Sequence, residues 1–167
     1  MRRLAPLALI VALGAMSLSG CATMGAPMDM TPSSAPAYVA MAASSDMFEI
    51  ESSRLALQRS RNAMNRMHAE MMIRDHMNTT TQLKAAAASA GLGVPMQMLP
   101  IHAAMLDALS RSTSFDATYK RQQVMSHQQA LALHDNYARR GDVPQLRGVA
   151  AAAVPVVRGH LDHSQRM

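Results

Sequence analysis

The stretch NAMNRMHAEMMIRDHMN, residues 62–78, shows how this chain builds a helix. Asn62 is typical of a helix cap, and the alanines and methionines that follow it are good helix formers. One side of the helix is marked by residues at three- and four-residue spacing, namely Ala69, Met72, His76, Thr79, Leu83 and Ala90. We therefore predict a helix over residues 63–90 whose marked side faces the protein core.

The same helix carries a second stripe, Met64, Met67 and Met71, turned about 100° from the first. Two interpretations are open. The methionines pack against a neighbouring helix as flexible side chains that fill gaps, or their thioethers bind monovalent copper or silver together with His68 or His76. The chain has 17 methionines spread along its whole length, which favours packing.

The chain beyond residue 36 has the same helical character throughout. It shows no strand-like alternation, and good helix formers dominate it. Further helices are predicted over residues 37–61, 100–111, 115–140 (capped by Ser114) and about 144–165, with breaks at Gly91 and Gly141. Long helices joined by short loops fold as antiparallel neighbours. The predicted fold class is all-α: an up-and-down four-helix bundle over residues 37–167, with a short extra helix in the middle connection.

Each long helix also directs polar side chains toward the predicted core. His127 shares a helix face with Phe115, Tyr119, Gln123, Ala130, His134 and Tyr137. On the last helix, His160 shares a face with Leu146, Ala150, Ala153, Val157 and Leu161. On the first helix, Glu49 and Glu51 lie at the edges of the face formed by Phe48, Ser52, Leu55 and Ala56. Bundles hold metals with inward carboxylates and histidines. The candidate ligands for a divalent transition metal are Glu49, Glu51, His76, His127 and His160. The alternative is that each histidine is a core residue hydrogen-bonded to a neighbour.

Four segments carry a resemblance to a known family: EIESSRLA (49–56), AEMMIRDH (69–76), FDATYKRQQVMSH (115–127) and PVVRGHL (155–161). Over residues 37–167 the chain resembles the domain-of-unknown-function 4142 family, small exported helical bundles with a ferritin-like fold. The family-motif residues are Asp75, Phe115, Asp116, Tyr119 and Leu161. The resemblance implies a ferritin-like fold and export, and it implies no particular reaction.

The carboxylates of a ferritin-type iron site are missing from the chain. Such sites use Glu-x-x-His on two helices, whereas Glu70 is followed three residues later by Ile73, and Asp116 by Tyr119. This argues against a di-iron oxidase and leaves a looser site of histidines and carboxylates. No serine lies in a Gly-x-Ser-x-Gly turn. We therefore do not expect an enzyme.

The N-terminus predicts export. Arg2 and Arg3 precede an apolar run, residues 4–18, that is too short to span a bilayer. It ends in Leu-Ser-Gly-Cys, the pattern of a bacterial lipoprotein signal. Residues 1–20 are thus expected to be a signal peptide that is cleaved before Cys21.

Cys21 is expected to be acylated and to anchor the protein in the lipid bilayer. Ala22, rather than an aspartate, resembles the sorting signal for the outer membrane, which predicts a place in the cell envelope on the periplasmic face of that membrane. Residues 21–36, with their prolines and no periodic apolar run, are expected to form a flexible tether.

Charge and cysteine content narrow the function further. Without Arg2 and Arg3, the sixteen basic residues become fourteen against eleven acidic ones, a formal net charge of +3. The arginines form no basic stripe interleaved with aromatic residues, so nucleic acid is not an expected partner. Acylation of Cys21, the one cysteine, leaves no thiol for a disulfide or a metal. We expect a non-enzymatic binding or structural module of the envelope, with a metal-binding bundle for a divalent ion or copper as the alternative.

Overall fold

The computed structural model describes residues 29–167, which form helices and connecting loops and contain no strand. The helices are α1 (Ala35–Arg59), α2 (Ala63–Ser89), α3 (Pro100–Ser110), α4 (Phe115–Arg140) and α5 (Pro144–Arg166). The predicted all-α bundle is confirmed, and every helix end lies within two residues of its expected position. The predicted signal peptide and Cys21 lie outside the described residues. No helix within residues 29–167 is both long and apolar enough to cross a membrane.

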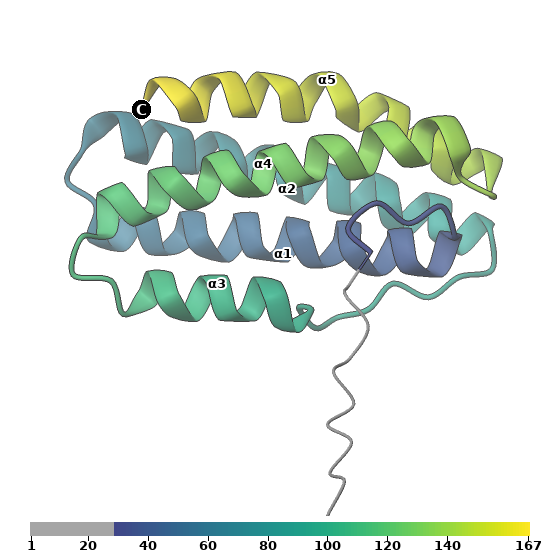
Figure 1. Ribbon diagram of the computed structural model, residues 1–167, viewed down its shortest axis with the longest axis horizontal. Helices are drawn as coiled ribbons and strands as arrows, with labels where there is room; N and C mark the ends of the chain where they lie inside the picture. Colours follow the sequence, from purple (N-terminus) through teal and green to yellow (C-terminus); the bar gives the residue numbers. More distant parts are fainter. Residues whose placement is uncertain (1–28) are drawn as a thin grey trace, which may run out of the picture.

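The four long helices form a bundle in which α1 packs against α2 and α4, and α5 packs against the same two helices (Figure 1). All four neighbouring pairs are antiparallel (Figure 1). The short α3 lies along the outside of the bundle, against α1 and α4. It carries the chain back along the bundle, so that α2 and α4 run in the same direction. The extra helix predicted for the middle connection is therefore the crossover of the fold.

Local signals in the sequence explain where the helices begin and end. The side chain of Asn62 accepts a hydrogen bond from the backbone N–H of Met64 at 2.9 Å and so caps α2. Gly91 follows α2 with a φ of 70°, the left-handed conformation that glycine adopts without strain. Ser114 stands at the cap position of α4, but its side chain makes no capping hydrogen bond. Ser114 therefore stands where the helix cap was predicted, but its side chain does not cap the helix.

The segment before α1 is attached to the bundle. The side-chain amide of Asn136 donates to the carbonyl oxygen of Thr31 at 2.6 Å. The backbone N–H of Asp142 donates to the carbonyl oxygen of Ser33 at 3.2 Å. α1 begins at Ala35 because a proline, here Pro36, costs nothing in a first helical turn. The boundary expected between tether and bundle, at 36/37, therefore lies inside the helix.

The interior of the bundle changes character along its length. An apolar end is built from Tyr38, Val39, Leu83, Ala87, Leu133, Tyr137, Leu146 and Ala150, and a smaller apolar cluster at the opposite end from Ala56, Ala69, Leu109, Phe115 and Tyr119. Between them along the helices lies a polar layer of buried residues: Glu49, Ser52, His76, Gln123, Ser126, His127 and His160, with His68 at its edge, next to Ala69 of the smaller cluster. This polar layer is where a functional site is to be sought, because buried polar groups are costly unless they are paired.

Candidate metal centre

Three histidines from three helices meet in the polar layer. His76 lies on α2, His127 on α4 and His160 on α5, and each is at most 4% exposed. One ring nitrogen from each lies within 4.8 Å of the other two. Within residues 29–167 this histidine trio is the one group of three or more potential metal ligands from histidine, cysteine and acidic residues.

Each ring in the trio uses one nitrogen to hold itself in place. Nδ1 of His76 lies 2.8 Å from a carboxylate oxygen of Asp46, and Nε2 of His160 lies 3.0 Å from one of Asp75. Nδ1 of His127 lies 2.7 Å from the backbone carbonyl oxygen of Gln123. Carboxylate and carbonyl oxygens only accept hydrogen bonds, so the imidazole nitrogen facing each of them must carry the proton.

The other nitrogen of each ring has no partner. Nε2 of His76, Nε2 of His127 and Nδ1 of His160 are buried and make no hydrogen bond. In a neutral imidazole, one nitrogen donates and the other bears a lone pair. With the donors fixed by Asp46, Gln123 and Asp75, the lone pairs of the neutral rings fall on the three unpartnered nitrogens. Metal-ligating histidines show this arrangement, in which an outer acceptor fixes the ring and aims its free nitrogen.

Asp46 is the most strongly held of these outer acceptors. Besides His76, it accepts hydrogen bonds from the hydroxyls of Thr79, at 3.0 and 3.1 Å, and Thr80, at 2.9 Å. The Asp46 side chain is 9% exposed and that of Asp75 is 25% exposed. The ring of His76 is therefore fixed from α1 by a buried carboxylate that is itself fixed from α2.

A third carboxylate, Glu49, lies beside the trio without bonding to it directly. One of its oxygens accepts from the hydroxyl of Ser126 at 2.5 Å and lies 3.8 Å from Nδ1 of His127. The other oxygen of Glu49 accepts from the side-chain NH2 group of Gln123 at 2.7 Å, and the side-chain oxygen of Gln123 lies 2.8 Å from Nε2 of His68. Glu49 thus places a negative charge next to the trio while serine and glutamine satisfy its oxygens.

Burial and these charges shift the pKa values of the three histidines in different directions. Burial, together with the charge of His76, lowers the pKa of His127 to about 3 and that of His160 to about 4. Burial opposes the protonation of His76 as well, but its hydrogen bond to Asp46 and the charges around it raise its pKa above the usual 6.5. Between about pH 4 and the raised pKa of His76, the metal-free trio therefore holds one extra proton, on His76, and two neutral rings.

Of the five ligands predicted from sequence, the structure brings four together. His76, His127 and His160 form the trio, and Glu49 lies beside it. Glu51 does not take part: its side chain is 44% exposed and pairs with Arg54 at 2.5 Å. Two residues along a helix correspond to a turn of about 200°, so Glu49 and Glu51 face opposite sides.

The family-motif residues play different parts. Asp75 binds His160. The Tyr119 hydroxyl lies 2.9 Å from that of Ser53, and Phe115 packs in the smaller apolar cluster. Asp116 is exposed in the first turn of α4, and Leu161 is half-buried.

Two parts of the site were missed by the sequence reasoning. Asp46 lies one helical turn before Glu49, so the spacing that selected Glu49 would also have selected Asp46. The role of Gln123, whose backbone holds His127 and whose side chain joins Glu49 to His68, had no signal beyond its place on the inner face.

Comparison with known proteins identifies the family. The chain belongs to the family that shares the domain of unknown function DUF4142, whose model matches residues 20–167. No match was found among curated proteins. Similar solved structures include CopM in the Cu(II)-bound form, with a TM-score of 0.67 and 21% identity over 80% of this chain and 94% of that one. CopM in the Ag-bound form obtained by co-crystallization gives a TM-score of 0.65 and 19% identity over 80% and 93%.

A DUF305 fragment from Deinococcus radiodurans is similar to a comparable degree, with a TM-score of 0.65 and 19% identity over 77% of this chain and 90% of that one. At this level of identity the likeness concerns the fold. It places the histidine trio inside a helical bundle that other proteins share.

Proposed function

We propose that this protein binds one copper ion through His76, His127 and His160. The observation that carries the proposal is the set of three buried ring nitrogens, within 4.8 Å of one another, that have no hydrogen-bond partner. When His76 is neutral, above its pKa, three lone pairs face one another in a buried place, where they repel each other and lack any compensating donor. A bound cation replaces this unfavourable arrangement with three ligand bonds.

The donor set favours a transition metal of intermediate softness. Imidazole nitrogens suit copper, zinc, iron and nickel, and neither calcium nor magnesium, which take oxygen ligands. The carboxylates of Asp46, Asp75 and Glu49 surround the trio and offset the charge of a buried cation. Copper is preferred among these metals because CopM, whose fold is similar, has Cu(II)-bound and Cu(I)-bound forms, and because Cu(II) stands highest in the affinity order of divalent ions.

The surroundings of the trio favour holding an ion over catalysis. The three histidines are almost completely buried, and in the described residues no further histidine, cysteine or acidic side chain joins them. Asp46, Asp75 and the Gln123 carbonyl orient the rings, and the packed helices exclude water. A site of this kind captures or stores a metal ion, which is the alternative function named from the sequence, a metal-binding bundle.

Titration calorimetry with Cu(II) on the purified, chelator-treated protein tests the proposal. We expect one Cu(II) ion per chain. Replacing any one of the three histidines with alanine should lower Cu(II) affinity by more than roughly 10–100-fold, which is the usual loss when a residue that hydrogen-bonds to a metal ligand is removed. His134→Ala is the matched control, because His134 also lies on α4 but pairs with Tyr38. Unchanged Cu(II) binding in the triple alanine variant would refute the site, and a clear preference for zinc would refute the choice of copper.

The place of this function is proposed from the N-terminal sequence. Leu-Ser-Gly-Cys at residues 18–21 supports a lipoprotein that is anchored through Cys21 in the cell envelope, on the periplasmic face of the outer membrane. Cys21→Ser is expected to abolish fatty-acid labelling and to leave the precursor uncleaved. Normal processing and membrane partitioning of that variant would contradict the anchor.

A further inference from the structure

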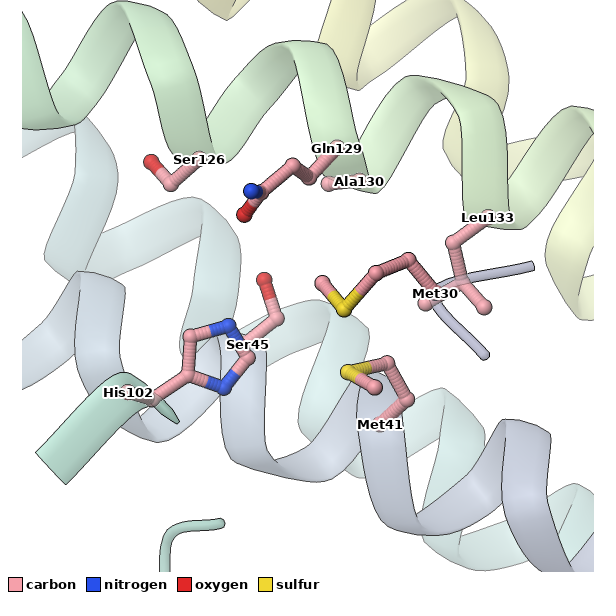
Figure 2. Close-up of a pocket in the computed structure, with 8 residues that line it drawn as sticks. All are labelled: Met30, Met41, Ser45, His102, Ser126, Gln129, Ala130 and Leu133. Carbon is pink, nitrogen blue, oxygen red and sulfur yellow. The ribbon is translucent and has the colours of Figure 1, made fainter. Parts of the chain in front are cut away.

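A second group of soft ligands lies outside the histidine trio. A small cavity of about 10 Å³, room for one water-sized group, lies between α1, α3, α4 and the segment before α1. Figure 2 shows the thioether sulfurs of Met30 and Met41 directed toward the middle of this cavity, with the ring of His102 and the hydroxyl of Ser45 beside them. No carboxylate lines the cavity.

The imidazole of His102 is held ready to act as a ligand. Its Nδ1 lies 2.7 Å from the hydroxyl oxygen of Ser44, and that oxygen accepts a hydrogen bond from the backbone N–H of Leu99 at 2.7 Å. In the tautomer in which Nδ1 donates to Ser44, the lone pair of the ring is on Nε2. His102 is 2% exposed. Burial lowers its pKa below the usual 6.5, so the ring is neutral at pH 7.

A further polar group points to an occupant of the cavity. The side-chain oxygen of Gln129, which lines the cavity from α4, is buried and has no hydrogen-bond partner. A buried carbonyl-type oxygen without a donor is costly. It is satisfied by a cation or by a water molecule in the cavity, and the two sulfurs that line the same cavity are poor partners for water.

We propose that this cavity is a second metal site, which takes one soft monovalent cation, Cu(I) or Ag(I), through the sulfurs of Met30 and Met41 and the imidazole of His102. Thioethers prefer soft ions such as Cu(I). All three ligands are neutral and no acidic side chain faces the cavity, so a monovalent ion carries the smallest uncompensated charge into this buried place. The histidine trio, with three carboxylates around it, has the opposite character and suits a divalent ion.

The position of Met30 depends on how the leading segment is attached. Hydrogen bonds from Asn136 to Thr31 and from Asp142 to Ser33 hold the segment that carries Met30 against α4. Met30 packs against the apolar end of the bundle. The site therefore joins a residue from outside the helices to ligands from α1 and α3.

Silver nitrate titration of protein labelled with ¹³C in its methionine methyl groups tests the site directly. We expect the methyl resonances of Met30 and Met41 to shift with the first equivalent of silver that fills this site, while the resonance of the exposed Met67 does not. Met30→Leu and Met41→Leu, changes that nearly conserve volume, should each lower silver affinity at this site at least tenfold, and Met67→Leu serves as the matched control.

The same titration separates this site from the histidine trio. In the triple alanine variant of the trio, the Met30 and Met41 methyl groups should respond to silver as in the unchanged protein. The proposal is wrong if these two methyl groups do not move, if both leucine variants keep the silver affinity of the unchanged protein, or if the trio variant abolishes the response. Failure of Cu(II) binding at the trio leaves the silver result unaffected.

Discussion

The apolar end and the polar layer of the bundle differ in whether their buried polar groups have hydrogen-bond partners. At the apolar end, Tyr38 and Tyr137 stack with ring centroids 3.9 Å apart, and both hydroxyls are paired, with His134 at 3.1 Å and Asp142 at 2.9 Å. In the polar layer, the three histidines face one another with an unpaired nitrogen in each ring. Within residues 29–167, three of the five buried side-chain atoms without a partner belong to the trio.

This difference separates stability from function. Folded proteins pair nearly all buried polar atoms, so a concentration of unpaired ones needs an explanation. The apolar end follows the general rule and stabilises the bundle. The polar layer departs from it at one place, where a ligand would supply the missing partner. Changes at the two places should therefore have different consequences for stability and for metal binding.

The largest change in stability is expected at the apolar end. Leu146 on α5 is fully buried there, so Leu146→Ala should lower the free energy of unfolding of the metal-free protein by about 2–5 kcal/mol. Urea denaturation measures this change. The variant that remains folded should still bind one Cu(II) ion per chain, because its cavity lies away from the trio. Loss of Cu(II) binding by the folded variant would show that the two regions are not independent.

His127→Leu should give the reverse pattern in the polar layer. The change removes a buried nitrogen that has no partner, and the Gln123 carbonyl that loses the imidazole is still inside a helix. We expect the free energy of unfolding of the metal-free protein to stay within about 1 kcal/mol or to rise. The stabilisation by Cu(II), about 2.7 kcal/mol when free metal exceeds Kd a hundredfold, should disappear.

His76→Leu is the matched comparison for this prediction. It leaves the Asp46 carboxylate without its imidazole partner, so the metal-free variant should lose roughly 1–3 kcal/mol. If His127→Leu instead destabilises the metal-free protein as much as Leu146→Ala does, then His127 is a structural core residue, and the contrast between the two regions fails.

A smaller effect is expected from the outer partner of His76. Asp46→Asn keeps the size of the side chain but removes the charge that orients and polarises His76, so Cu(II) affinity should fall by about 10–100-fold. Calorimetry measures the change. Asp107→Asn is the control, because Asp107 forms an exposed pair with Arg111 on the distant surface of α3. Equal losses in the two variants would mean that only the overall charge matters.

The sequence predicted the fold well because helical periodicity carries that information. The repeat of 3.6 residues placed His76, His127 and His160 on inner faces, and the breaks at Gly91 and Gly141 located the helix ends. Periodicity does not distinguish a stripe that packs against a neighbour from one that faces solvent. Met64 and Met67, which we expected to pack, are 42% and 56% exposed.

Other parts of the two proposed sites depend on contacts between elements that no spacing encodes. The unpaired nitrogens of the trio follow from which acceptor each ring meets, and His160 differs from the other two in the nitrogen it uses. Met30 lies in a segment without regular structure, so no period relates it to Met41 on α1 or His102 on α3. Such groupings appear only after the helices have packed.

The last prediction concerns protons, which sharpen the contrast between the three rings of the trio. The pKa of His76 is raised above 6.5 and those of His127 and His160 are lowered to about 3 and 4, so at pH 6 the metal-free trio holds one exchangeable proton, on Nε2 of His76. Cu(II) must displace it, and binding should release close to one proton per ion. Below the pKa of His76 and above about pH 4, affinity should fall tenfold, about 1.4 kcal/mol, per pH unit as the pH is lowered; below pH 4 it should fall more steeply.

Calorimetry at pH 6 in two buffers that differ in ionisation enthalpy counts the protons released on Cu(II) binding. Asp46→Asn, which removes the carboxylate that raises the His76 pKa, should reduce the release at this pH. Release of two or more protons at pH 6 would mean that His127 or His160 is charged in the metal-free protein, contrary to the arrangement of lone pairs on which the copper site rests.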